Sequence, residues 1–128
     1  MFKTINDTHG HLAGDRALIQ ITQALEKGIR KSDSIGRIGG EEFAVHLKNV
    51  NYELAVDIAE RLRKNVKAAN ENFDLEGVDL SVSIGAVIYK ERIDLPTLMT
   101  KADRLLYKAK ENGRNRVEHN RISNKAVV

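Results

Sequence analysis

The residues best suited to chemistry are two glycines followed by two carboxylates, Gly39-Gly40-Glu41-Glu42. Glycine tolerates positive φ angles and lets another molecule approach the backbone without a Cβ in the way. Glutamate oxygens beside that approach are hard ligands for a divalent cation. The pattern therefore suits a divalent metal together with a phosphate, although a Gly-Gly pair followed by acids is also common in solvated hairpin turns.

Two short apolar segments flank these residues and indicate a β-hairpin. Residues 34–38 read as a short strand, and residues 43–47 alternate apolar with polar or small positions. Gly39 and Gly40 then lie in the turn, which holds the carboxylates at the tip of the hairpin.

Apolar periodicity predicts the other elements. Asp15 can cap the first helix, and Glu60 and Lys64 can form a charge pair on the second. We expect a loop over 1–14, helices over 15–28, 52–70 and 98–113, a turn region that includes Pro96, and strands over 80–89 and 116–118. Helices crossing over strands in this order predict an α/β sandwich, of the α+β kind, with a mixed sheet and the hairpin at one end.

Composition excludes several classes of protein. A chain of 128 residues with 41% hydrophobic and 30% charged residues is one small globular domain. No apolar run approaches the ~20 residues of a membrane span, and the first residues do not resemble a signal peptide. The chain has no cysteine, a net charge of +3 and only three Tyr and three Phe, which disfavours disulfides and a nucleic-acid surface. We therefore expect a cytoplasmic protein without a membrane segment.

Four separated motifs occur together in one order. They are Phe2-Lys3-x-Ile5-Asn6-Asp7-x-x-Gly10-His11-x-x-Gly14-Asp15, Gly39-Gly40-Glu41-Glu42-Phe43, Ser83-Ile84-Gly85 and Ala102-Asp103-x-x-Leu106-Tyr107-x-Ala109-Lys110-x-x-Gly113-Arg114-Asn115-x-Val117. In this combination the chain closely resembles the GGDEF domain of diguanylate cyclases. The resemblance implies a nucleotidyl-cyclase, ferredoxin-like mixed sheet flanked by helices over 1–118, with a C-terminal tail over 119–128.

The resemblance also implies a reaction that makes a bacterial second messenger for signal transduction. Two GTP molecules, one on each domain of a homodimer, condense to cyclic di-GMP with release of two pyrophosphates. Glu41 matches the residue that binds Mg²⁺ or Mn²⁺, and Glu42 matches a second acid that activates the attacking 3′-hydroxyl or holds a second metal. Gly39 and Gly40 are expected beside the substrate.

Other matched residues imply the contacts to GTP. Asn6 and Asp15 match the family's guanine-recognising pair, and a carboxylate can accept from the N1 and N2 donors of guanine. Lys110 and Arg114, four apart on the last predicted helix, match residues that hold the triphosphate, and Lys3 is expected to join them. The alternatives are an N-cap for Asp15, a turn residue for Asn6, and complements of the helix dipole for the two cations.

An RxxD pair precedes the hairpin. Arg30 and Asp33, with five residues between Asp33 and Gly39, resemble the family's inhibitory site, where the product cyclic di-GMP restrains the enzyme. Arginine can pair with phosphate through two hydrogen bonds or stack on guanine, and Arg61 on the next predicted helix is the expected partner. The alternative is a solvated ion pair in a loop.

One feature departs from the family pattern. The family's first strand, which ends in Asp-x-Asp and supplies a metal ligand, is not found before Phe2. From this we expect an N-terminally truncated domain with exposed strand edges and weak or absent cyclase activity. A non-catalytic module that binds cyclic di-GMP or GTP is therefore the second hypothesis. His9 and His11 are not expected to bind metal, and Gly85 is expected to provide room for close packing.

Overall fold

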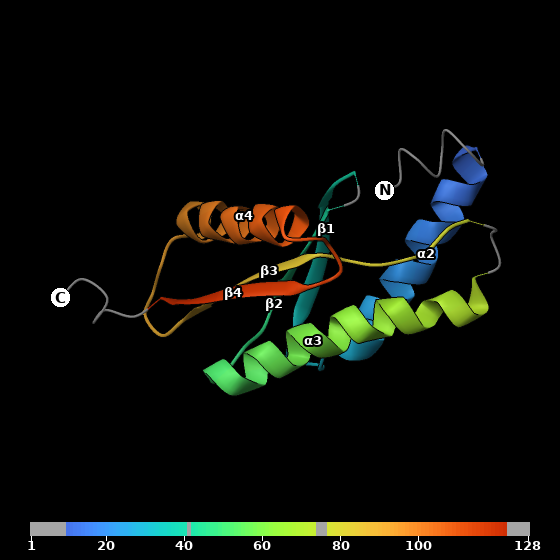
Figure 1. Cartoon of the computed structure of the whole chain (residues 1–128). Coiled ribbons are helices and arrows are strands. Elements are labelled where there is room, and N and C mark those ends of the chain that lie inside the picture. Colours follow the sequence, from blue (N-terminus) through green and yellow to red (C-terminus); the bar gives the residue numbers. More distant parts are fainter. Residues whose placement is uncertain (1–9, 41, 74–76, 123–128) are drawn as a thin grey trace. The chain divides into compact units, whose positions relative to one another are not determined.

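The computed structural model describes residues 10–40, 42–73 and 77–122 (Figure 1). The chain divides into two compact units, Met1–Asn49 with Lys64–Leu80 and Val50–Arg63 with Ser81–Val128, here called the first and second units. The elements are α2 (His11–Gly28), β1 (Ser34–Gly39), β2 (Glu42–His46), α3 (Tyr52–Ala68), the 3₁₀ helix η1 (Ala69–Asn72), β3 (Ile84–Tyr89), α4 (Leu95–Glu111) and β4 (Val117–Ile122).

The first unit begins with α2, which starts earlier than predicted. Its N-cap is Gly10, with φ of 89° and no side-chain capping bond, so Asp15 lies inside the helix instead of capping it. The predicted loop is therefore wrong from His11 onward. Burial explains the longer helix, because its buried side continues back by one turn at helical spacing. That side consists of Ala13, Ala17, Ile21, Ala24 and Leu25.

The predicted hairpin is confirmed in the first unit. Strands β1 and β2 pair antiparallel, with Ile35 opposite Val45 and Gly39 opposite Glu42. The register shifts between Arg37 and Gly39, which places an irregularity of the β-bulge kind close to the turn. The hairpin therefore delivers Gly39 and Glu42 to the tip from its two strands.

The end of α3 is tied to the segment that leads toward β3. The Asn70 side chain donates from Nδ2 to the carbonyls of Lys67 and Leu80, both at 2.9 Å, and its Oδ1 accepts from the Leu80 N–H at 2.7 Å. Leu80 is fully buried. Because Asn70 occupies both backbone groups of Leu80, the strand predicted from residue 80 begins only at Ile84.

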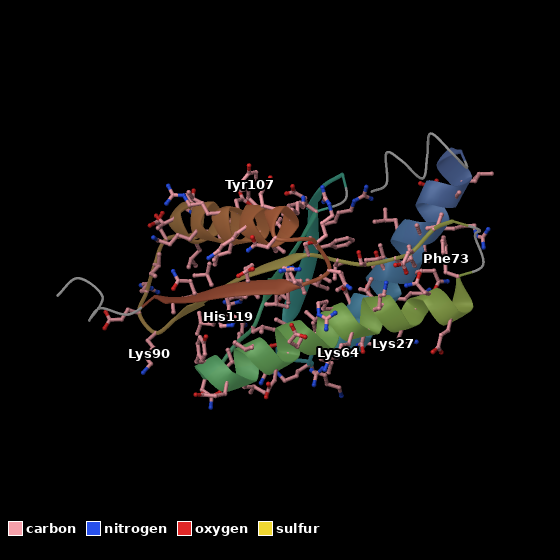
Figure 2. The ribbon with its side chains drawn as sticks, in the orientation of Figure 1. Lys27, Lys64, Phe73, Lys90, Tyr107 and His119 are labelled. Atoms are coloured by element: carbon pink, nitrogen blue, oxygen red, sulfur yellow. The ribbon has the colours of Figure 1, made fainter. Side chains whose placement is uncertain are left out.

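A second contact in the first unit joins α2 to the residues after η1. The guanidinium of Arg16 lies over the ring of Phe73, 5.6 Å from its centroid, and Phe73 is buried. The Phe73 side chain is labelled in Figure 2. Cation–π pairs of this kind stabilise modestly at partly exposed sites. Phe73 thus anchors the end of η1 against α2.

The second unit is built on a parallel pair of strands covered by α4. Strand β3 pairs with β4 from Ile84 opposite Val117 to Tyr89 opposite Ile122, so β4 is longer than the three residues predicted. A Cβ added at Gly85 would lie 2.3 Å from the Leu106 backbone nitrogen and 2.4 Å from the Ala102 carbonyl oxygen. The prediction that Gly85 provides room for close packing is confirmed.

Helix α4 begins before the turn region predicted around Pro96 has ended. Asp94 is its N-cap and accepts from the Thr97 N–H at 3.3 Å, with Pro96 in the first turn. Proline is tolerated there because the first N–H groups of a helix have no intrahelical acceptor.

On α3, Glu60 pairs with Arg63 at 3.0 Å, where the sequence predicted a pair with Lys64.

Helices with small sheets confirm the α+β class. Among the strands that the structure describes, pairing gives one antiparallel and one parallel two-stranded sheet, and no single mixed sheet. None of the described helices is long and apolar enough to cross a membrane.

Candidate functional site

The glycine turn of the hairpin is open. Gly39 ends β1, Gly40 follows with φ of 35°, and Glu42 begins β2 with an exposed side chain. The Arg37 side chain stabilises the turn, since its Nε donates to the Gly40 carbonyl at 2.7 Å. A Cβ placed at Gly39 or Gly40 would meet no atom within 4 Å. Another molecule can therefore reach the backbone at this tip.

The metal prediction rests on Glu41, which lies outside the described residues. In residues 10–40, 42–73 and 77–122, no group of three His, Cys, Asp or Glu side chains could hold a metal ion. The donor chemistry at the tip nevertheless fits Mg²⁺ or Mn²⁺, because the exposed Glu42 carboxylate supplies hard oxygen ligands. His9 also lies outside the described part.

The residues predicted to recognise guanine are only partly described. Asn6 and Lys3 lie outside the described residues. Asp15 is exposed on α2 in the first unit. Since Gly10 holds the N-cap position, the Asp15 carboxylate is not used as a helix cap and is accessible to a ligand.

The two predicted triphosphate residues both belong to the second unit. Lys110 is half-buried in the last turn of α4, but α4 ends at Glu111, so Arg114 follows the helix and is exposed. The prediction that both cations lie on one helix is wrong for Arg114. The structure gives neither side chain a hydrogen bond or ion pair with a described residue, which leaves both cations open to an anionic ligand.

The RxxD pair forms an internal clamp in the first unit. Arg30 donates from Nε to Asp33 Oδ2 at 3.0 Å and from Nη2 to Oδ1 at 2.9 Å. The Arg30 and Lys48 N–H groups also donate to this carboxylate, and Arg30 Nη2 donates to the Lys48 carbonyl at 2.6 Å. The Asp33 side chain is 0% exposed and that of Arg30 is 33% exposed. The pair is therefore not a solvated one.

This environment favours the ionised form of Asp33. The hydrogen bonds from the Arg30 guanidinium hold the pKa of Asp33 well below its usual range, with further lowering by the Arg30 and Lys48 amides, while burial acts in the opposite direction. Arg61, the third residue predicted for the product site, is exposed on α3 in the second unit.

Replacing Asp33 by asparagine is expected to lower the free energy of unfolding by about 2 kcal/mol at pH 7, because the buried partner of Arg30 loses its charge. A depressed folded pKa contributes stability above the unfolded value of about 4 and loses it as the pH falls further. The difference between wild type and variant, measured by urea unfolding, should therefore shrink below about pH 4.

Asp79→Asn provides a control for this prediction. Asp79 is 71% exposed and pairs with Lys67 at 2.5 Å, so its loss should change stability little. A difference between wild type and Asp33→Asn that stayed constant from pH 7 down to pH values well below 4 would contradict the prediction.

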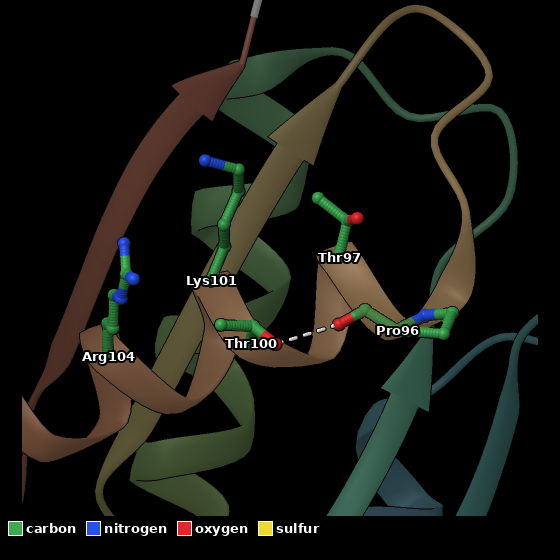
Figure 3. Close-up of a pocket in the computed structure, with 5 residues that line it drawn as sticks. All are labelled: Pro96, Thr97, Thr100, Lys101 and Arg104. Carbon is green, nitrogen blue, oxygen red and sulfur yellow. Dashed lines mark hydrogen bonds between the residues drawn. The ribbon is translucent and has the colours of Figure 1, made fainter.

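Sequence reasoning did not single out a hollow on α4. It has a volume of about 310 Å³ and is lined by Pro96, Thr97, Thr100, Lys101 and Arg104 (Figure 3). The Thr100 hydroxyl donates to the Pro96 carbonyl at 2.9 Å, so this hydroxyl is used within the helix. In the sequence, the hollow is indicated only by the helical spacing of residues 97, 100, 101 and 104. The hollow contains none of the residues predicted for chemistry.

Comparison with known proteins identifies relatives along most of the chain. The family model described as the GGDEF domain of diguanylate cyclases matches residues 1–116. Diguanylate cyclase A of Treponema denticola is 39% identical over 117 residues, which cover 91% of this chain and 32% of that protein. The chain thus spans about a third of that relative's length.

Two solved structures are similar in fold. The active GGEEF domain of a diguanylate cyclase from Vibrio cholerae has a TM-score of 0.81 and 33% identity, with 95% of this chain and 78% of that chain covered. The GGDEF domain of DgcB from Caulobacter crescentus, in complex with c-di-GMP, has a TM-score of 0.79 and 28% identity, with 92% and 71% covered.

Proposed function

Because the chain belongs to the GGDEF domain family of diguanylate cyclases, we propose that it condenses two GTP molecules to cyclic di-GMP and two pyrophosphates across a dimer of two such domains. The observation that carries the proposal is the open glycine tip with the exposed Glu42 beside it. We place this activity in the cytoplasm, where GTP is available.

Each condensation step joins the 3′-oxygen of one GTP to the α-phosphorus of the other. The bond from that phosphorus to pyrophosphate breaks as the new bond forms, and the hydroxyl proton passes to a base, the role proposed for Glu42. Glu41 would hold Mg²⁺ or Mn²⁺, which when bound neutralises charge on the phosphate oxygens. Gly39 and Gly40 let the substrate approach the backbone.

Charged and polar side chains at other positions hold the substrate. Lys110 and Arg114, whose side chains make no hydrogen bond or ion pair with described residues, bind the triphosphate, and Lys3 adds a third cation. Asn6 and the exposed Asp15 read the guanine edge, where a carboxylate pairs with the N1 and N2 donors. Adenine does not present these two donors, so the pair selects GTP.

Product inhibition belongs to the same proposal. Asp33 and Lys48 hold the Arg30 guanidinium in one orientation while a third of its side chain stays exposed. Such a fixed guanidinium is suited to a phosphate or a guanine of cyclic di-GMP, with Arg61 as a second cation. The DgcB complex with c-di-GMP supports a product-binding role in the family.

The test is incubation of this chain with GTP and Mg²⁺, followed by chromatography of the nucleotides and measurement of pyrophosphate. We expect two pyrophosphates for each cyclic di-GMP. Binding of cyclic di-GMP or GTP without any turnover would support the alternative, a non-catalytic binding module. A chain that neither turned over nor bound these nucleotides would overturn the proposal.

A further inference from the structure

Three consecutive residues after α4 have left-handed backbone. The φ angles are 122° at Gly113, 64° at Arg114 and 45° at Asn115. Positive φ is ordinary for glycine and uncommon for side chains with a Cβ, and it persists where the surroundings hold it. The conformation of Arg114 and Asn115 therefore needs contacts that fix it.

Hydrogen bonds hold this segment from both directions. The Arg114 N–H donates to the Ala109 carbonyl at 2.9 Å, and the Arg114 carbonyl accepts from Arg116 Nε at 3.2 Å. The Asn115 Oδ1 accepts from Nη1 of Arg63, on α3, at 3.1 Å. The first two bonds come from neighbouring residues, whereas the third joins the segment to Arg63, which is distant in the sequence and belongs to the same unit.

Arg63 is itself held in place. Its Nε and Nη2 donate to Glu60 Oε2 at 3.1 and 3.0 Å, and its side chain is only 20% exposed. This leaves Nη1 directed at Asn115. A guanidinium fixed on one edge by a carboxylate offers the other edge at a defined position, so the Asn115 side chain meets a preoriented donor.

From these contacts we infer that Asn115 and Arg63 are positioning residues that aim Arg114 at the substrate triphosphate. The inference rests on the proposed function, in which Arg114 binds that group. The Arg114 side chain has no bond to a described residue that could orient it, so its direction depends on the backbone that Asn115 and Arg63 hold. Neither positioning residue is required to touch the ligand.

The test measures binding of a GTP analogue with a methylene group between its α- and β-phosphates, which cannot be condensed, by titration calorimetry. Asn115→Gly keeps access to left-handed backbone but removes the acceptor, and Arg63→Met removes the donor. We expect each to raise Kd about 10-fold. Asn115→Asp keeps an acceptor for Arg63 and should restore affinity to within about threefold. Lys64→Met, which removes an exposed cation next to Arg63, should bind like wild type.

A positioning role also predicts coupling to Arg114. In an Arg114→Met background, Asn115→Gly should cause no further loss, because there is no cation left to aim. An equal loss in both backgrounds would mean that Asn115 acts only on general stability, and would overturn the inference.

Failure of the inference is distinguishable from failure of the proposed function. If wild type does not bind the analogue, or Arg114→Met binds it as tightly as wild type, the triphosphate role of Arg114 is wrong and the inference falls with it. If Arg114→Met loses binding while Asn115→Gly and Arg63→Met keep it, only the positioning role is wrong.

Discussion

Substitution of Glu42 by glutamine is expected to lower kcat for cyclic di-GMP formation by about 100-fold or more and to change KM for GTP by less than about threefold. Glutamine has nearly the same size but cannot take the proton of the attacking hydroxyl. Glu42 is exposed at the start of β2, so its loss of charge should leave the fold intact. The substitution should therefore slow the chemical step and leave GTP binding nearly unchanged.

The measurement is steady-state turnover at saturating GTP and Mg²⁺, with circular dichroism to verify folding. Glu26→Gln is the matched control, because Glu26 is an exposed glutamate on α2 in the same unit and has no proposed role. If Glu42→Gln turned over as fast as wild type, Glu42 would not be a catalytic residue, and Glu41 would have to act alone.

Substitution of Gly85 by alanine is expected to lower the free energy of unfolding by at least about 3 kcal/mol, equivalent to a fall in Tm of about 10 °C. The new Cβ would lie 2.3 and 2.4 Å from backbone atoms of α4. Backbone atoms within a helix cannot rotate away as a flexible side chain can, so β3 and α4 must separate. The effect should be confined at first to the second unit.

Thermal unfolding and amide hydrogen exchange test this prediction. Gly36→Ala is the control, since a Cβ on this β1 residue meets no atom within 4 Å. It should leave Tm nearly unchanged, whereas Gly85→Ala should accelerate exchange in β3 and α4. A Tm of Gly85→Ala equal to that of wild type would show that β3 and α4 are not in the close contact described.

Local sequence patterns were sufficient to predict much of the secondary structure of this protein. The alternation on either side of Gly39 and Gly40 predicted the hairpin, because strand period and turn chemistry both act between neighbouring residues. Helical periodicity predicted α3 and most of α4 for the same reason. The four motifs also indicated the family, and the glycine of the Ser83-Ile84-Gly85 motif was correctly attributed to close packing.

Other features depended on contacts between residues far apart in the sequence. The polar residues before Asp15 favoured a loop up to residue 14, but burial of Ala13 and Ala17 extends α2 back to His11. Asn70 binds both backbone groups of Leu80, which no alternation in residues 80–89 could indicate. The buried Asp33 carboxylate likewise accepts from the N–H of Lys48, fifteen residues away.

The sequence by itself determined which residues could do chemistry, since residue type and motif spacing are local properties. Only the tertiary structure decided the backbone conformation and exposure of some of these residues. Four-residue spacing suggested one helical face for Lys110 and Arg114, but α4 ends at Glu111 and the backbone turns left-handed. The bond between Arg63 and Asn115 braces that turn across 52 residues of chain, and such a long-range contact forms only when the unit folds.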